Sequence, residues 1–152
     1  MRLIMFFLLN FFISCQNDSI YEKYHSFENN MWNTDTVVSF SVDIKDSLTN
    51  YDASLMIRHT TEYDYRNLFL FTQFSNLNDT LEIYLADKAG KWNGSGFGDV
   101  RELTIPFFTA KQLNIKNNLF HIEQAMRYAE KEKIINLKGI KAIGLRIRKS
   151  EK

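Results

Sequence analysis

The chain has 152 residues, of which 45% are hydrophobic and 24% are charged, a composition typical of a single globular domain. Its formal net charge is only +1, and the lysines and arginines near the C-terminus fit the charged edges of a terminal strand. This balance argues against nucleic acid as a partner, because nucleic-acid binders usually carry a basic stripe that faces the phosphates.

The first residues of the chain have the layout of a signal peptide. After Met1 and Arg2 comes an apolar run over residues 3–12, broken only by Asn10, and the sequence becomes polar directly after Cys15. The run is too short for a membrane-spanning helix, which needs roughly 20 apolar residues. We therefore predict that residues 1–14 are a cleaved leader.

Cys15 is the only cysteine of the chain. A lone cysteine after an ordinary secretory leader would be an exposed thiol in an oxidising compartment. The residues that end at Ser14 and Cys15 are similar to the lipobox of bacterial lipoproteins, in which a small residue precedes a cysteine acylated on sulfur by a fatty acid such as palmitate. The sequence therefore predicts that Cys15 carries the lipid and that a membrane is the partner of this end of the chain.

After the leader, residues 15–30 are expected to form the lipidated N-terminus and a tether, and residues 31–152 a single domain. From residue 36 onward apolar and polar side chains alternate with a period of two, which indicates strands with one buried face. The run at residues 68–74 is apolar on both faces and is expected to be a central strand. The expected strands are residues 36–44, 53–59, 68–74, 80–86, 100–107, 119–126 and 141–149.

Turn-forming residues separate these runs at 46–47, 76–79, 117–118 and Gly139. About seven or eight short strands at this spacing predict an all-β fold, an antiparallel β-sandwich for which a jelly roll is one possible arrangement. Residues 124–136 have the Ala, Glu and Lys content of a short helix, although Ile134 and Ile135 favour a crossing loop.

Residues 90–99 hold four of the six glycines in the chain. The spacing G-x-G-x-G does not match a phosphate-binding loop, and no helical pattern follows. One interpretation is a long loop whose glycines permit positive φ. The other is a surface on which Trp92 stacks on a sugar or on an aromatic residue of a partner. The candidate interaction surface comprises Trp92, Gly94, Gly96, Gly98 and Asp99.

Two arginines, Arg58 and Arg127, sit in otherwise apolar stretches and are added to this candidate surface. The alternative for both is an ion pair at a sheet edge or a side chain that extends along apolar surface into water.

No pattern for catalysis, a metal or a cofactor emerges. His25, His59 and His121 are far apart, without cysteines or ordered acids beside them. No Gly-x-Ser-x-Gly elbow is present. The acids that could supply a glycosidase pair are scattered and more typical of solvated strand ends; they are Asp79, Glu82, Asp87 and Asp99. We therefore expect a protein that is not an enzyme.

Several short motifs follow one another in a characteristic order along the chain. They are Tyr21-x-x-Tyr24, Leu55-Met56-Ile57-Arg58, Tyr63-x-Tyr65-x-Asn67-Leu68, the glycine-rich residues 90–99, Gln124-Ala125-Met126-Arg127 and Gly144-Leu145-Arg146-Ile147. Together with the leader cysteine they resemble the gliding-motility lipoprotein family GldH. The resemblance implies an envelope lipoprotein of Bacteroidetes-type bacteria that is needed for surface gliding and is associated with the machinery that secretes and moves adhesins. It implies no catalytic residues.

Two functions follow from these observations. The first is an assembly or accessory component of the gliding and secretion machinery, anchored by lipid to the outer membrane facing the periplasm and in contact with other envelope proteins. The alternative is a glycan-binding β-sandwich lipoprotein, because small sandwiches with exposed aromatic rings can bind sugars by stacking.

Overall fold

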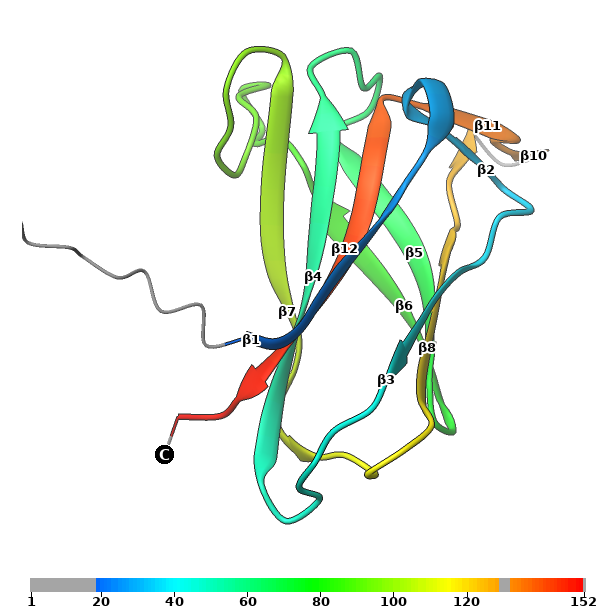
Figure 1. Cartoon of the computed structure of the whole chain (residues 1–152). Coiled ribbons are helices and arrows are strands. Elements are labelled where there is room, and N and C mark those ends of the chain that lie inside the picture. The colour runs from blue at the N-terminus through cyan, green and yellow to red at the C-terminus, as the bar shows by residue number, and fades with distance from the viewer. Residues whose placement is uncertain (1–18, 129–131, 152) are drawn as a thin grey trace, which may run out of the picture.

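Eight long strands form two four-stranded antiparallel sheets that pack face to face (Figure 1). The structure is a computed structural model and describes residues 19–128 and 132–151. The first sheet contains, in spatial order, β1 (Ser19–Ser26), β12 (Ile140–Lys149), β4 (Asn50–Thr60) and β7 (Val100–Gln112). The second contains β3 (Val38–Val42), β8 (Asn118–Gln124), β5 (Asn67–Phe74) and β6 (Leu77–Tyr84). The predicted β-sandwich is confirmed.

The order of these strands identifies the type of sandwich. Counted along the chain from one to eight, the long strands lie in the order 1-8-3-6 in the first sheet and 2-7-4-5 in the second. This order, with two interleaved Greek keys, is that of a jelly roll. The short elements flank the sandwich; they are η1 (Glu28–Asn30), β2 (Met31–Asn33), β9 (Arg127–Tyr128), β10 (Glu132–Lys133) and β11 (Asn136–Lys138).

The core lies between the two sheets and follows from the alternation in the sequence. In β12, Ile143, Leu145 and Ile147 are fully buried, and in β4 Leu55 and Ile57 lie opposite Leu145 and Ile143. The second sheet supplies the other half of the core, including Leu68, Leu70, Phe120 and Ile122. The prediction that residues 68–74 form an internal strand is confirmed, because β5 pairs with both β6 and β8.

The domain begins earlier than residue 31, where the sequence was expected to change from tether to fold. Residues 19–26 form β1, which pairs with β12, and Tyr21 packs against the core. The strand was missed because its inward positions after Tyr21 are Lys23 and His25, so no apolar alternation marks it. Lys23 instead places its ammonium 5.5 Å from the centre of the Tyr21 ring.

One local prediction is also corrected, and the helix that was the less favoured alternative for residues 124–136 is absent from the part of that segment that the structure describes. The β5–β6 turn lies at Ser75 and Asn76, with Ser75 at φ 56°, whereas Leu77 and Asp79 already pair with Phe74 and Thr72 in the hairpin. The described part of residues 124–136 contains no helix, because the backbone of β9 pairs with that of β10 there. Exposed polar residues in an edge hairpin had been read as a turn, and helix propensity was overridden by strand pairing.

The topology gathers the chain connections at two ends of the sandwich (Figure 1). One end has the start of β1, the end of β12 and the connections at residues 43–49, 75–76 and 113–117; we call it the N-terminal end. The opposite end, which we call the distal end, has the connections at residues 61–66 and 85–99. The glycine-rich residues therefore lie at the end opposite to the start of β1.

A candidate interaction surface at the distal end

The glycine-rich loop folds back on the strands that it connects. It is fixed at one side by a bridge between Ala86 and Trp92 and at the other by a bridge between Ser95 and Glu102. The Ser95 amide donates to the Glu102 carbonyl at 3.0 Å, and the Glu102 amide donates to the Ser95 carbonyl at 2.7 Å. The carboxylate of Asp87 accepts hydrogen bonds from the backbone of residues 89 and 91. The loop is thus held by its backbone along the edge of β7.

Two of the glycines make this close approach possible. A Cβ atom at Gly94, where φ is +81°, would lie 2.2 Å from the carbonyl oxygen of Glu102, and a Cβ at Gly96 would lie 2.0 Å from that of Val100. Only glycine fits at these distances. Gly90 also has a positive φ, of +83°, but its Cβ position has nothing within 4 Å. The glycines therefore serve the conformation of the loop, as the first of the two interpretations proposed.

The loop presents one large apolar side chain to solvent. Phe97 lies between Gly96 and Gly98 and is 96% exposed. Single exposed apolar residues are common on protein surfaces, and Phe97 is the most exposed of the large apolar side chains in the described residues. Sequence reasoning missed this residue, although an aromatic residue with a glycine on each side was a signal that could have singled it out.

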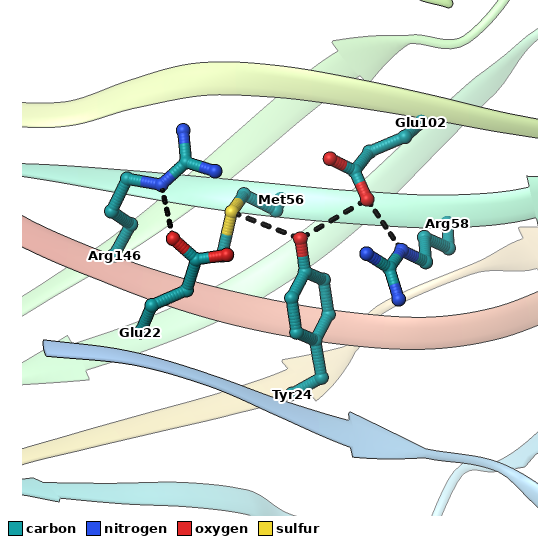
Figure 2. A network of polar contacts seen from close by, with 6 residues as sticks. All are labelled: Glu22, Tyr24, Met56, Arg58, Glu102 and Arg146. Atoms are coloured by element: carbon teal, nitrogen blue, oxygen red, sulfur yellow. Dashed lines mark hydrogen bonds and ion pairs between the residues drawn. The ribbon is translucent and has the colours of Figure 1, made fainter. Parts of the chain in front are cut away.

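Next to the loop, Glu102 joins three strands of the first sheet on its outer face (Figure 2). Glu102 of β7 lies directly opposite Arg58 of β4, and Arg58 Nε donates a hydrogen bond to Glu102 Oε2. The hydroxyl of Tyr24, from β1, donates to the same oxygen at 3.0 Å. The guanidinium of Arg58 lies 3.8 Å from the centre of the Tyr24 ring, a cation–π contact. The ion-pair interpretation of Arg58 is therefore what the structure shows.

The electrostatics of this group follow from the same contacts. The hydrogen bond to Glu102 raises the pKa of Arg58, so the guanidinium stays charged. Partial burial, and then the neighbouring carboxylate, raise the pKa of Tyr24 and keep its hydroxyl protonated as a donor. With side-chain exposures of 41% for Arg58 and 28% for Glu102, the pair is half in solvent, so its contribution to stability is modest.

Gly144 of β12 allows Tyr24 to reach across the sheet. A Cβ atom there would lie 2.7 Å from Cδ1 of the Tyr24 ring and 2.8 Å from Cε of Met56. The Tyr24 hydroxyl also lies 3.2 Å from the Met56 sulfur. A second ion pair, between Arg146 Nε and Glu22 Oε2 at 2.8 Å, lies beside this group (Figure 2).

Trp92 does not offer the stacking platform that the sequence suggested. Its ring is only partly exposed and packs against the core, 4.8 Å from the ring centre of His59. His59 is fully buried, and its Nδ1 lies 3.0 Å from the Thr60 carbonyl. A carbonyl only accepts, so Nδ1 carries the proton and Nε2 is left as a buried acceptor with no partner among the described residues. Burial lowers the pKa of His59, so the imidazole is neutral near pH 7.

The remaining candidates fall into two groups. Gly98 and Asp99 continue the loop, and the Asp99 carbonyl accepts from the Thr61 amide at 2.8 Å, which ties the loop to residues 61–66. Arg127 lies elsewhere, exposed in β9 and opposite Lys133 of β10. The structure therefore brings together Arg58 and the glycine loop, through Glu102, and leaves Arg127 outside. We call Phe97, Arg58, Tyr24 and Glu102 the distal surface.

Residues 19–128 and 132–151 hold neither a metal site nor a helix that could span a membrane. Within these ranges no group of three or more His, Cys, Asp or Glu side chains is placed to hold a metal ion. Nor do they contain a helix with the length and apolarity that crossing a membrane requires.

A comparison with protein families matches residues 19–147 to the family described as GldH lipoprotein. The chain belongs to the GldH lipoprotein family. It is 34% identical to the gliding motility lipoprotein GldH homolog of Christiangramia forsetii, over 97% of this chain and 94% of the relative. It is 29% identical to the gliding motility lipoprotein GldH of Flavobacterium johnsoniae, over 91% of this chain and 89% of the relative. No solved structure matches the chain.

Membership of GldH confirms the resemblance that the sequence motifs carried. A lipoprotein of this family is held in the cell envelope by a lipid anchor. The leader at residues 1–14 and Cys15 lie outside the residues that the structure describes. Acylation of Cys15 therefore stays a prediction, supported by its being the only cysteine in the sequence.

Proposed function

We propose that this GldH lipoprotein is a non-enzymatic assembly or accessory component of the gliding-motility and protein-secretion machinery. The lipid on Cys15 holds it to the outer membrane on the periplasmic side, and the distal surface binds another envelope protein. The names of the two relatives, both gliding motility lipoproteins, support a role in gliding motility. The geometry of the distal end supports the mode of action.

The observation that carries this proposal is the display of Phe97. A ring that is 96% exposed gains more from being covered by a partner than any other side chain of the loop. The loop is already fixed by the paired backbones of Ser95 and Glu102, so binding orders few additional groups and little conformational entropy is lost. Aromatic anchors on rigid elements are typical hot spots of protein interfaces.

The charged part of the distal surface has a supporting role in this proposal. Arg58, Tyr24 and Glu102 satisfy one another, and the pairing of Glu102 with Ser95 links them to the loop that carries Phe97. Half-exposed polar groups of this kind form the rim of an interface, where they set orientation more than affinity.

The experiment that tests the proposal replaces Phe97 in cells. We expect Phe97→Ala to abolish photo-crosslinking of the distal surface to an envelope protein and to reduce gliding and adhesin secretion, with protein level and membrane retention unchanged. The matched control is Val37→Ala, which removes a half-exposed apolar side chain elsewhere on the domain. Wild-type gliding and secretion in the Phe97→Ala strain would count against the proposal.

A second candidate function, glycan binding, is favoured by a hollow on the outer face of the second sheet. It has a volume of about 460 Å³, and Phe71 and Glu123 line it together with the amides of Gln73 and Asn78. An aromatic ring beside amides and a carboxylate suits a saccharide. Phe71, which is partly exposed, takes the place of Trp92 as the stacking residue. A glycan array on which the wild-type domain binds no saccharide would remove this candidate, and loss of binding in Phe71→Ala would support it.

A further inference from the structure

The connections at the N-terminal end share a feature that the proposed function does not use. An exposed aliphatic side chain lies in or directly next to each of the three. These side chains are Leu48 at 84% exposure, Leu77 at 60% and Ile115 at 51%. Leu77 directly follows the turn at residues 75–76, and the other two lie within the connections at residues 43–49 and 113–117. In Figure 1 all three connections lie at the bottom of the molecule, opposite to the glycine loop.

Hydrogen bonds join two of these connections into one surface. The Ile44 amide donates to the Ile115 carbonyl at 3.1 Å, and Gln112 Nε2 donates to the Leu48 carbonyl at 3.3 Å. The third connection adjoins them, since Leu77 and Lys111 line the same hollow. The three aliphatic side chains are therefore held at one end of the sandwich.

Charged side chains of both signs accompany these aliphatic residues. The acids of this end include Asp43, Asp46, Asp52 and Glu151, and several of them accept hydrogen bonds within the domain. The lysines of this end are Lys45, Lys111, Lys116 and Lys149. Asp46 accepts hydrogen bonds from the Leu48 amide at 2.9 Å and from the Thr49 hydroxyl. Asp52 accepts from the Ala110 amide and the Ser150 hydroxyl. These bonds lower the pKa of both acids and tie their carboxylates to the backbone and side chains of their own end.

The length of the segment before β1 limits how far the lipid on Cys15 can lie from this end. Cys15 precedes Ser19, the first residue of β1, by four residues, and four residues span at most ~14 Å. Ser19 lies opposite Arg148, which in turn lies opposite Asp52 near the start of β4. A lipid on Cys15 therefore enters the bilayer beside the N-terminal end.

The tether is too short for the lipid on Cys15 to lie next to the distal end of the domain. β4 has 11 residues and runs the length of the first sheet, which at 3.2–3.4 Å per residue is ~36 Å. The tether is long enough to bring Cys15 to the level of Leu48 and much too short to bring it to the glycine loop.

We propose that the N-terminal end lies on the surface of the bilayer that holds the lipid. Leu48, Leu77 and Ile115 enter the boundary between headgroups and acyl chains, and the lysines face anionic headgroups, as in proteins that bind one leaflet. The inference rests on the lipid anchor of the proposed function and deepens it, because it fixes the direction in which the distal surface points, away from the membrane.

A single introduced cysteine can report this orientation, because acylation uses the thiol of Cys15. The mature acylated protein is prepared with Leu48→Cys, Ile115→Cys or Phe97→Cys, labelled with an environment-sensitive fluorophore, and reconstituted into vesicles of phosphatidylethanolamine and phosphatidylglycerol. We expect lipid-borne quenchers to reduce the emission at positions 48 and 115 at least threefold more than at position 97. Equal quenching at the three positions, or stronger quenching at 97, would overturn the inference.

A second measurement separates the bilayer from other occupants of this end. The unacylated Cys15→Ala protein carrying Leu48→Cys is labelled and examined without vesicles over a hundredfold range of concentration. We expect a water-exposed label throughout; a label that becomes shielded as concentration rises would show that a second copy covers the surface and would overturn the inference. Both measurements use purified protein, and only the first uses lipid vesicles, so both are independent of the crosslinking at Phe97 that tests the proposed function.

Discussion

The two ends of the sandwich differ in how their connections are held and in which apolar side chains they expose. The distal end has a long connection held by backbone pairing at Ser95 and Glu102, and it displays one aromatic ring, Phe97. The N-terminal end has short connections stabilised by carboxylates, and it displays three separate aliphatic side chains among lysines. A rigid aromatic anchor suits a protein partner, whereas scattered aliphatic tips with cations suit a lipid interface. The difference shows that the two ends of a jelly roll can carry side chains suited to different partners.

The largest expected effect comes from separating the N-terminal end from its membrane. We predict that Cys15→Ala releases nearly all of the mature protein from the membrane fraction, because the aliphatic tips alone bury far fewer CH₂ groups than acyl chains that each contribute about 0.8 kcal/mol per CH₂. Fractionation followed by immunoblotting measures this. The circular dichroism spectrum of the released domain serves as the control for folding. Retention equal to that of wild type would contradict the assignment of Cys15.

The rigidity of the distal end can be tested by comparing two glycines of its loop. Gly94→Ala introduces strain at positive φ and a clash with the Glu102 carbonyl, so we predict a loss of about 2–3 kcal/mol in the free energy of unfolding. Gly90→Ala is the matched control, since Gly90 has a similar positive φ, of +83°, with open space around its Cβ position, and should cost only about 1 kcal/mol. Urea unfolding measures both, and equal losses would show that the close approach at Gly94 contributes nothing.

The buried imidazole beneath Trp92 should make the distal end sensitive to acid. Burial, with a smaller effect of the nearby Arg101, lowers the pKa of His59 below its ordinary value of 6.5, so the unfolded chain takes up a proton at a higher pH than the folded chain. The contribution to stability is complete above pH 6.5 and is lost as the pH falls below it, by at most about 1.4 kcal/mol per pH unit.

Urea unfolding between pH 7.5 and pH 5 measures this slope. The variant His59→Phe keeps an aromatic ring against Trp92 but cannot take up a proton, and should remove the slope in this window. An unchanged slope in the variant would assign the pH dependence to other groups. The acids with lowered pKa at the N-terminal end, Asp46 and Asp52, act only at lower pH, because their ordinary value is 3.8.

The smallest effect is expected at the ion pair of the distal surface. Glu102→Gln keeps an acceptor for Tyr24 but removes the charge that faces Arg58. Because the pair is half in solvent, we predict a loss of about 0.2–1 kcal/mol in the free energy of unfolding. A double-mutant cycle with Arg58→Met isolates the interaction. A coupling energy above about 2 kcal/mol would mean that Tyr24, Arg58 and Glu102 act as one cooperative group.

Much of the sandwich was predictable from local alternation. β12 and β4 show apolar residues at every second position, and both were located because burying one face of a strand imposes that period. β1 was not located, since its inward Lys23 and His25 lie on an edge strand where polar side chains reach water. Tertiary position, rather than local preference, decided its conformation.

The candidate site was predictable only in part. Arg58 stood out as a charge within an apolar strand, but its partner Glu102 is 44 residues away in sequence and only the β4–β7 register brings the two together. Trp92 was read as exposed because it lies among glycines, whereas the bridge to Ala86 turns its ring toward His59. Sequence shows which residues are unusual, and strand register decides which of them meet.

The backbone pairing of the glycine loop has a consequence for the behaviour of the protein at high concentration. β7 is an edge strand of the first sheet, and an open edge offers unpaired amides and carbonyls to a strand of another molecule. Ser95 occupies those groups at Glu102, so the loop blocks sheet extension at the start of β7. In a crowded envelope, the same ten residues would therefore keep the start of β7 from pairing with a strand of another molecule.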